Sequence, residues 1–162
     1  MLGTVLEDPH LKEGPEINNR TLIKGIGLLP LKTKFLKNKK TRQIKSESLW
    51  PSLSKINGFE IHNGKSELDK SQNTSQIKPL FKDIELGWYL DNNKSGTVAG
   101  TYIHGIFEND IWRDNYINFI KKKKKFPTMP NKSRSYKIKR EAIINNLANE
   151  FDKHLNISAL LN

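Results

Sequence analysis

The stretch TVAGTYIHGIFENDIWRDNYINFI, residues 97–120, decides the fold class because the spacing of its apolar residues changes near Phe107. Before Phe107, alternating residues predict a strand over 97–104. After it, apolar residues recur at helical spacing, at Trp112, Tyr116, Phe119 and Ile120. Asn109 stands where a helix N-cap is expected. The stretch therefore predicts a strand that leads into a helix.

Upstream of this stretch, alternating residues predict more strands, separated by polar turns. A half-buried strand is expected over residues 31–35, with an antiparallel partner over 41–45 across a turn at Lys37–Lys40. A further strand at Ile56–His62 is expected to end in a turn at Asn63–Gly64.

Turn-forming residues also predict where regular structure is missing. The clusters Glu7–His10 and Lys12–Pro15 leave little room for helices or strands in residues 1–24. Residues 69–76 are polar throughout and are expected to form a mobile loop.

The C-terminal half predicts a hairpin and two helical segments. A strand over 84–89 is expected to join the 97–104 strand through a turn at 91–96. A second helix is expected to start near Ser135. Its apolar residues recur every four positions, at Ile143, Leu147 and Phe151. Asn156 is expected to cap a last short turn over 157–161. Strands followed by helices in one short chain predict an α/β or α+β domain.

The composition is that of a basic, cysteine-free chain of 162 residues with a net charge of +11. No apolar run approaches the ~20 residues of a membrane helix, so a cytoplasmic protein without membrane contact is expected. The lack of cysteine excludes disulfides, thiolate zinc sites and a thiol nucleophile from these residues. The run Lys121–Lys125 has one flanking aromatic residue, so we expect solvated surface rather than a specific nucleic-acid site.

Three motifs with possible chemical roles are weak. Gly58 and Gly64-Lys65-Ser66 resemble a phosphate-binding loop, but five residues separate the glycines instead of four. The Gly25–Gly27 segment lacks the third glycine of a dinucleotide-binding turn. The four histidines, His10, His62, His104 and His154, have no ligand spacing. Neither a metal nor a cofactor is therefore expected to bind these residues.

His104 is the strongest candidate for chemistry. It stands at the carboxyl end of the 97–104 strand between Gly100 and Gly105, where a substrate could approach closely. An imidazole at such a position can exchange protons near neutral pH. A packed or surface histidine would have the same spacing, so the spacing alone leaves both interpretations open. Glu60 and His62 add a carboxylate and a second imidazole on one side of a strand.

Four segments occur in the order seen in a known enzyme family: Leu28–Pro30, Lys40–Gln43, Gly58–Gly64 and Gly100–Asp110. With them, the sequence resembles the carboxy-terminal CobB/CobQ-type glutamine amidotransferase domain of cobyric acid synthases over nearly all of its length. The resemblance implies the carboxy-terminal part of a class I glutamine amidotransferase-like, flavodoxin-like α/β domain over residues 1–162.

The resemblance also implies a chemistry. In this family a cysteine attacks the side-chain amide of glutamine, and the histidine that matches His104 serves as its base. The released ammonia passes to a synthetase domain that amidates adenosylcobyrinic acid a,c-diamide in cobalamin biosynthesis. ATP and magnesium are expected in that synthetase domain, with no cofactor in these residues. The roles of Glu60 and His62 stay open.

One departure from the family concerns the nucleophile. The family motif Cys-Gly-Gly-x-Gln-Met-Leu-Gly is matched only from Met1, so the cysteine, the opening strands and the synthetase half are expected to lie outside this sequence. The chain is thus expected to be a fragment of a ligase that is inactive alone. The alternative is a non-catalytic basic binding module derived from an amidotransferase domain.

Overall fold

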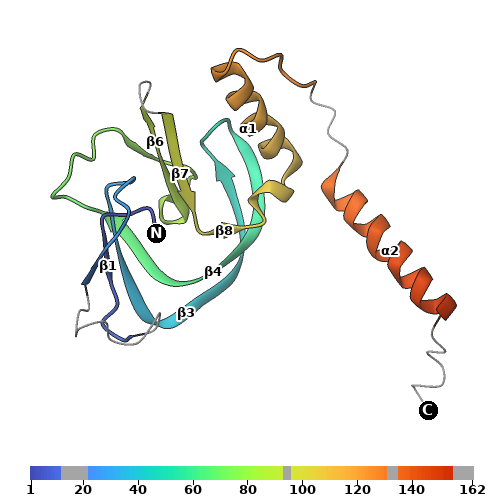
Figure 1. The fold of residues 1–162 in the computed structure, drawn as a ribbon, viewed down its shortest axis with the longest axis horizontal. Coiled ribbons are helices and arrows are strands. Elements are labelled where there is room, and N and C mark those ends of the chain that lie inside the picture. The colour runs from blue at the N-terminus through green and yellow to red at the C-terminus, as the bar shows by residue number, and fades with distance from the viewer. Residues whose placement is uncertain (12–21, 93–95, 131–134, 155–162) are drawn as a thin grey trace. The chain divides into compact units, whose positions relative to one another are not determined.

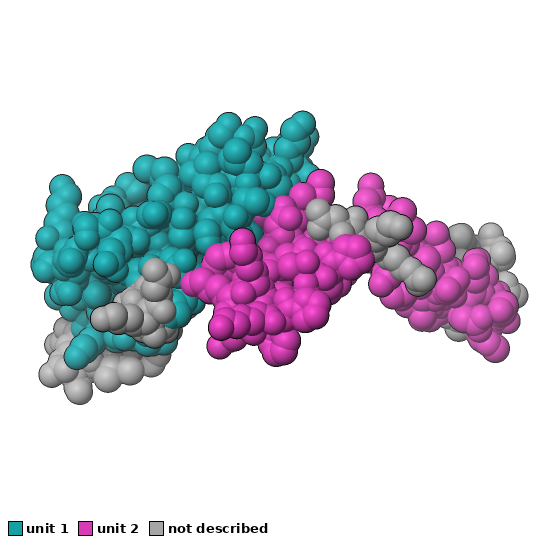
Figure 2. Space-filling model, turned by 90° about the horizontal axis from the view of Figure 1, so that it is seen from above, with its two compact units in different colours: residues 1–106 teal, residues 107–162 magenta. Residues whose placement is uncertain are grey.

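The computed structural model describes residues 1–11, 22–92, 96–130 and 135–154. The chain divides into two compact units, residues 1–106 and 107–162 (Figure 2). The strands that the structure describes all lie in the first unit, and the two described α-helices lie in the second (Figure 1). The predicted order of strands followed by helices in a mixed α/β chain is therefore confirmed.

A five-stranded sheet in the order β2-β1-β3-β4-β8 forms most of the first unit. Its strands are β1 Val5–Glu7, β2 Leu22–Lys24, β3 Leu31–Ser48, β4 Ser54–Leu68 and β8 Ile103–His104. The long strands β3 and β4 pair antiparallel along their length (Figure 1). Among the described strands of this sheet, the pairing of β1 with β3 alone is parallel.

A second sheet has three antiparallel strands in the order β5-β6-β7. These are β5 Ile77–Pro79, β6 Gly87–Asn92 and β7 Gly96–Thr101, and the 3₁₀ turn η1 Ile84–Leu86 precedes β6. The β6–β7 hairpin confirms the strand pairing expected there, although residues 93–95 of its predicted turn lie outside the described residues. The strand expected over 84–89 begins only at Gly87.

Buried apolar side chains from the five-stranded sheet and from connecting segments form the core of the first unit. They include Leu29, Leu31, Ile44, Ile56, Leu80, Phe81, Leu86 and Ile103. Along β4, the even-numbered positions from Ile56 to Ser66 face this core, because successive side chains of a strand point to opposite faces. This inner face includes Glu60 and His62.

Two turns predicted from polar residues are wrong. Lys37–Lys40 lies within β3, so residues 31–35 and 41–45 belong to one strand and both pair with β4. The ladder is irregular between Phe35 and Lys40, where polar residues take up a shift in register. Asn63–Gly64 lies inside β4 rather than after it. The connection between β3 and β4 falls instead at residues 49–53, beside the cis peptide Trp50–Pro51.

The beginning of the chain has more regular structure than expected, because β1 and β2 lie within residues 1–24. The Lys12–Pro15 cluster lies outside the described residues. Residues 69–76 do form a loop, but its first residue, Asp69, is buried. Asp69 accepts hydrogen bonds from Thr4 and Ser71 and pairs with Lys32 at 3.2 Å. These contacts tie β1 to the end of β4.

The second unit begins with the 3₁₀ turn η2 Ile106–Glu108, followed by α1 Asp110–Lys123 and α2 Tyr136–His154. Asn109 is the N-cap residue of α1, as predicted. On the predicted apolar face, the rings of Trp112 and Tyr116 stack with centroids 5.2 Å apart. No side chain of α2 is buried. The short turn expected over 157–161, with its cap Asn156, lies outside the described residues.

Neither described helix has the length and apolar character needed to cross a membrane.

Candidate active site

His104 is the last residue of β8, and its side chain is exposed. It lies opposite Phe59 of β4 in the antiparallel ladder. Gly105 follows with a φ of 78°, a conformation that glycine adopts without a steric penalty, and the chain turns there. The single strand predicted over 97–104 is wrong, because the chain leaves the three-stranded sheet after Thr101 and joins the five-stranded sheet at Ile103. His104 nevertheless stands at the end of a strand, as the sequence predicted.

The strand that carries His104 lies unusually close to β4 at Gly58. A Cβ atom on Gly58 would lie 2.5 Å from the carbonyl oxygen of His104 and 2.5 Å from the Ile103 side chain. Such distances do not occur between real atoms, so any other residue at position 58 would push β8 away. The absence of a side chain at Gly58 therefore allows the backbone of His104 to lie against β4.

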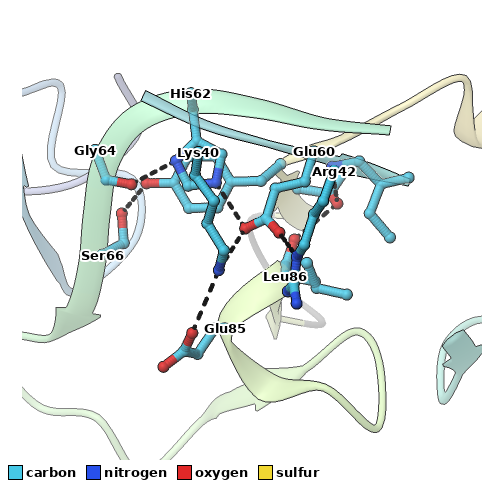
Figure 3. A network of polar contacts seen from close by, with 11 residues as sticks. Lys40, Arg42, Glu60, His62, Gly64, Ser66, Glu85 and Leu86 are labelled. Atoms are coloured by element: carbon cyan, nitrogen blue, oxygen red, sulfur yellow. Dashed lines mark hydrogen bonds and ion pairs between the residues drawn. The ribbon is translucent and has the colours of Figure 1, made fainter. Parts of the chain in front are cut away.

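A charged cluster surrounds Glu60 on the inner face of β4 (Figure 3). The Glu60 side chain is only 1% exposed, and its carboxylate accepts hydrogen bonds from Arg42 and from His62 Nε2, the latter at 2.8 Å. Lys40 Nζ lies 3.0 Å from the same carboxylate and 3.8 Å from Glu85. Arg42 comes from the position of β3 directly opposite Glu60.

These partners determine the ionisation of Glu60. Burial by itself would raise the pKa of Glu60, but hydrogen bonds from Arg42, His62 and Lys40 outweigh it and lower the pKa to about 2. Glu60 is therefore a carboxylate at neutral pH, and a proton-donating role for it is excluded there.

His62 is held at both ring nitrogens. Nε2 faces the Glu60 carboxylate, and Nδ1 faces the backbone carbonyl of Gly64 (Figure 3). Both partners are hydrogen-bond acceptors, and the two contacts hold opposite edges of the ring. The ring stacks on Tyr102, with centroids 3.8 Å apart and planes 14° apart.

Tyr102 links this cluster to a chain of hydroxyl groups. Its hydroxyl is hydrogen-bonded to Ser66, and Ser66 lies 2.6 Å from Thr33 Oγ1. Burial raises the pKa of the Tyr102 hydroxyl, which therefore stays protonated at neutral pH.

Two cavities meet at Ser66 and Tyr102. One, of about 90 Å³, lies beside the charged cluster and is lined by Lys40, Glu60 and His62 among others. The other, of about 210 Å³, is lined by Met1–Gly3, Trp88 and Gly100 among others. Ser66 and Tyr102 line both cavities.

The structure brings Glu60 and His62 together, as their spacing predicted, but places His104 on the other face of the sheet. His104 is the ladder partner of Phe59, and the side chain of Phe59 points away from the face that carries Glu60. His10 and His154 lie elsewhere. Among the described residues, no group of three or more histidine and acidic side chains could hold a metal ion. The weak phosphate-loop pattern from Gly58 to Ser66 is extended strand and forms no phosphate-binding turn.

Sequence reasoning missed the partners of the cluster. Lys40 and Arg42 stand in one of the segments quoted for the family resemblance, but their contact with Glu60 depends on the β3–β4 register. Tyr102 and Ser66 had no such signal, because Ser66 lies in β4 and Tyr102 lies between β7 and β8. No local spacing joins these two residues, because 36 positions separate them in the chain.

Comparisons with known proteins identify the family. The family model for the CobB/CobQ-like glutamine amidotransferase domain matches residues 1–112. The chain is 66% identical over 162 residues to a curated cobyric acid synthase of Prochlorococcus marinus strain MIT 9312, covering 100% of this chain and 32% of the relative. It is 40% identical over 162 residues to the cobyric acid synthase of strain MIT 9313, covering 99% of this chain and 32% of that relative.

The chain thus spans about a third of the length of the curated relatives it matches. The matched region contains both of the segments described above, Gly58–Gly64 and Gly100–Asp110. On these grounds, the chain belongs to the CobB/CobQ-like glutamine amidotransferase domain family.

Proposed function

We propose that this chain is the base-carrying part of the glutamine amidotransferase of a cobyric acid synthase. Its role is to release ammonia from glutamine for the ATP-dependent amidation of adenosylcobyrinic acid a,c-diamide in cobalamin biosynthesis. The observation that carries the proposal is the exposed His104 at the end of β8, within the region that matches the family.

His104 is the proposed general base. It accepts the proton of a cysteine thiol supplied by another segment, because these residues contain no cysteine. The thiolate attacks the side-chain amide carbon of glutamine, and the carbon–nitrogen bond breaks. His104 returns the proton to the leaving nitrogen, which departs as ammonia, and water then hydrolyses the thioester to glutamate and free thiol.

The amidation itself is assigned to a synthetase domain outside these residues. The relatives are about three times as long as this chain, which leaves room for such a domain. ATP and magnesium are proposed to bind to that domain.

The test uses a full-length protein in which residues 1–162 continue from the upstream part of a Prochlorococcus relative that carries the nucleophilic cysteine. His104→Ala should lower glutamine-dependent amidation by ~10² to 10⁴-fold, because a general base contributes that much to rate. Amidation with free ammonia should be retained, because ammonia enters after the glutaminase step. Both rates are measured by amide formation.

Two controls accompany this test. His10→Ala and His154→Ala should change neither rate, since both residues lie outside the matched motifs. The 162-residue chain by itself should hydrolyse no glutamine, because it has no thiol. Equal loss of the glutamine and ammonia reactions in His104→Ala would overturn the proposed role.

A further inference from the structure

Two segments that are far apart in the sequence lie against each other residue by residue. Gly58 permits the close approach of β8, Phe59 is paired with His104, and Glu60 is paired with Ile103. The next inward residue of β4, His62, stacks on Tyr102. The Gly58–His62 segment thus contacts every residue from 102 to 104.

We propose that His62, held in place by Glu60, is a positioning residue for His104 and acts through the ring of Tyr102. This inference rests on the proposed function, because it concerns the orientation of the proposed base. His62 and His104 belong to opposite faces of the sheet, so His62 acts through the strand rather than by touching the substrate of His104.

The first step is that the His62 ring has little freedom to rotate. Hydrogen bonds to Glu60 and to the Gly64 carbonyl hold opposite edges of the ring. The Glu60 carboxylate is itself held by Arg42 and Lys40. Rotation of the ring would break a hydrogen bond to a buried carboxylate, which is among the stronger kinds of hydrogen bond in proteins.

The second step is that this ring fixes Tyr102. The two rings are nearly parallel and stacked, an arrangement that adds to the attraction between aromatic side chains. The Tyr102 hydroxyl is bonded to Ser66, and its backbone N–H donates to the Leu86 carbonyl at 2.9 Å. Tyr102 is therefore held at its ring, its hydroxyl and its backbone.

The third step is that β8 needs this support. It is only two residues long, so the ladder to β4 supplies few hydrogen bonds of its own. Gly105 follows directly with a positive φ. The position of His104 therefore depends on the residue that precedes β8, which is Tyr102.

The decisive experiment compares two substitutions of His62 in the full-length protein defined above. His62→Ala removes the stacking and both hydrogen bonds, whereas His62→Phe keeps an aromatic ring under Tyr102. We expect His62→Ala to lower kcat for glutamine hydrolysis by up to ~10²-fold with KM nearly unchanged, because misplacement by about 1 Å can cost that much. His62→Phe should recover part of this loss, and amidation with free ammonia should be unaffected in both variants.

A second measurement, on the 162-residue chain, is independent of catalysis. Hydrogen exchange of the Tyr102 and Ile103 amides, which donate to Leu86 and to Thr101 Oγ1, reports whether the segment before His104 is held. His62→Ala should speed exchange at both amides by at least ~10-fold, and His62→Phe by less. The amide of Leu49, which donates to Leu80, is the internal control and should keep its rate.

Unchanged kcat in His62→Ala, or a His62→Phe variant no better than His62→Ala, would overturn the inference. If His62→Ala does not fold, His62→Phe is compared with Tyr102→Leu, which removes the other ring. Equal kcat values for Tyr102→Leu and the unsubstituted protein would then overturn the inference. Failure of the proposed function gives a different result, because His104→Ala would then leave glutamine hydrolysis unchanged. The exchange rates would still test whether His62 holds Tyr102 in place.

Discussion

The inner face of β4 and the apolar stripe of α2, formed by Ile143, Leu147 and Phe151, are equally regular in sequence but differ in their surroundings. Along β4, inward positions such as Ile56 and Glu60 are each 1% exposed. Along α2, the three stripe residues are 50% to 68% exposed. Periodicity thus predicts the element in both cases, but it does not say what covers the apolar face.

The largest difference between the two regions should appear when one leucine in each is truncated. Leu86, which is packed in the core of the first unit, is 0% exposed, and Leu147 is 57% exposed. Leu86→Ala should lower the free energy of unfolding by about 2–5 kcal/mol through lost burial and a residual cavity. Leu147→Ala should change it by at most about 0.5 kcal/mol. Urea denaturation followed by tryptophan fluorescence measures both values, and equal effects would show that the α2 stripe is covered in solution.

A smaller difference should appear in acid. The pKa of Glu60 is about 2 in the folded chain, against an ordinary value of 4.5. The ionised form of Glu60 therefore stabilises the folded state relative to the unfolded state. This stabilisation is complete above pH 4.5 and is lost as the pH falls through 2. Asp69, whose pKa is lowered chiefly by a hydrogen bond from Ser71, acts in the same direction.

Glu60→Gln tests this pH dependence directly. The variant should be less stable by about 1–3 kcal/mol at pH 7, because hydrogen bonds to a charged group are lost, and the difference should shrink toward pH 2. Glu150→Gln in α2 is the matched control, and its stability should fall with decreasing pH as that of the unsubstituted chain does. A constant difference between Glu60→Gln and the unsubstituted chain from pH 7 to pH 2 would contradict the assigned ionisation. Thermal unfolding across this pH range supplies the data.

The smallest effect is expected for an ion pair on α2. Lys153 Nζ lies 2.6 Å from Glu150, and both side chains are more than half exposed. Lys153→Gln should cost no more than about 0.5 kcal/mol, and the cost should disappear in high salt. A larger loss in the same denaturation assay would mean that α2 is held more firmly than its exposure indicates.

The elements were predictable where local spacing determines them, and not where partners from distant segments decide. The helix after Asn109 and the β6–β7 hairpin follow from local patterns. The turn expected at Asn63–Gly64 is wrong because Gly64 is a buried strand position, where a Cβ atom would lie 2.8 Å from the Thr33 side chain. Asparagine and glycine are turn-forming residues, but here close packing between strands accounts for the glycine.

The candidate site was predictable to a similar extent. The spacing of Glu60 and His62 predicted that they share a face, and the end of a strand marked His104. The contact of Glu60 with Arg42 depends on the register between β3 and β4, which no local pattern specifies. The predicted turn at Lys37–Lys40 would instead have paired the two halves of β3 with each other. The stacking of His62 on Tyr102 joins residues 40 positions apart and needs both sheets in place.

The incomplete pairing of β3 has a consequence for self-association. Only Lys32–Lys34 of β3 pair with β1 in a ladder. In the described part of the chain, Phe35 and residues 40–47 therefore have a ladder partner on one side only, which is β4, and residues 36–39 pair with neither strand. An open strand edge of this length can template the addition of a strand from another molecule.

Three exposed lysines, Lys37, Lys39 and Lys45, lie in this part of β3. A second copy pairing there would bring lysines close to lysines, and the repulsion between them disfavours such a contact. A few of the 28 basic residues can thus oppose edge-to-edge association of two copies, an effect that requires no binding partner.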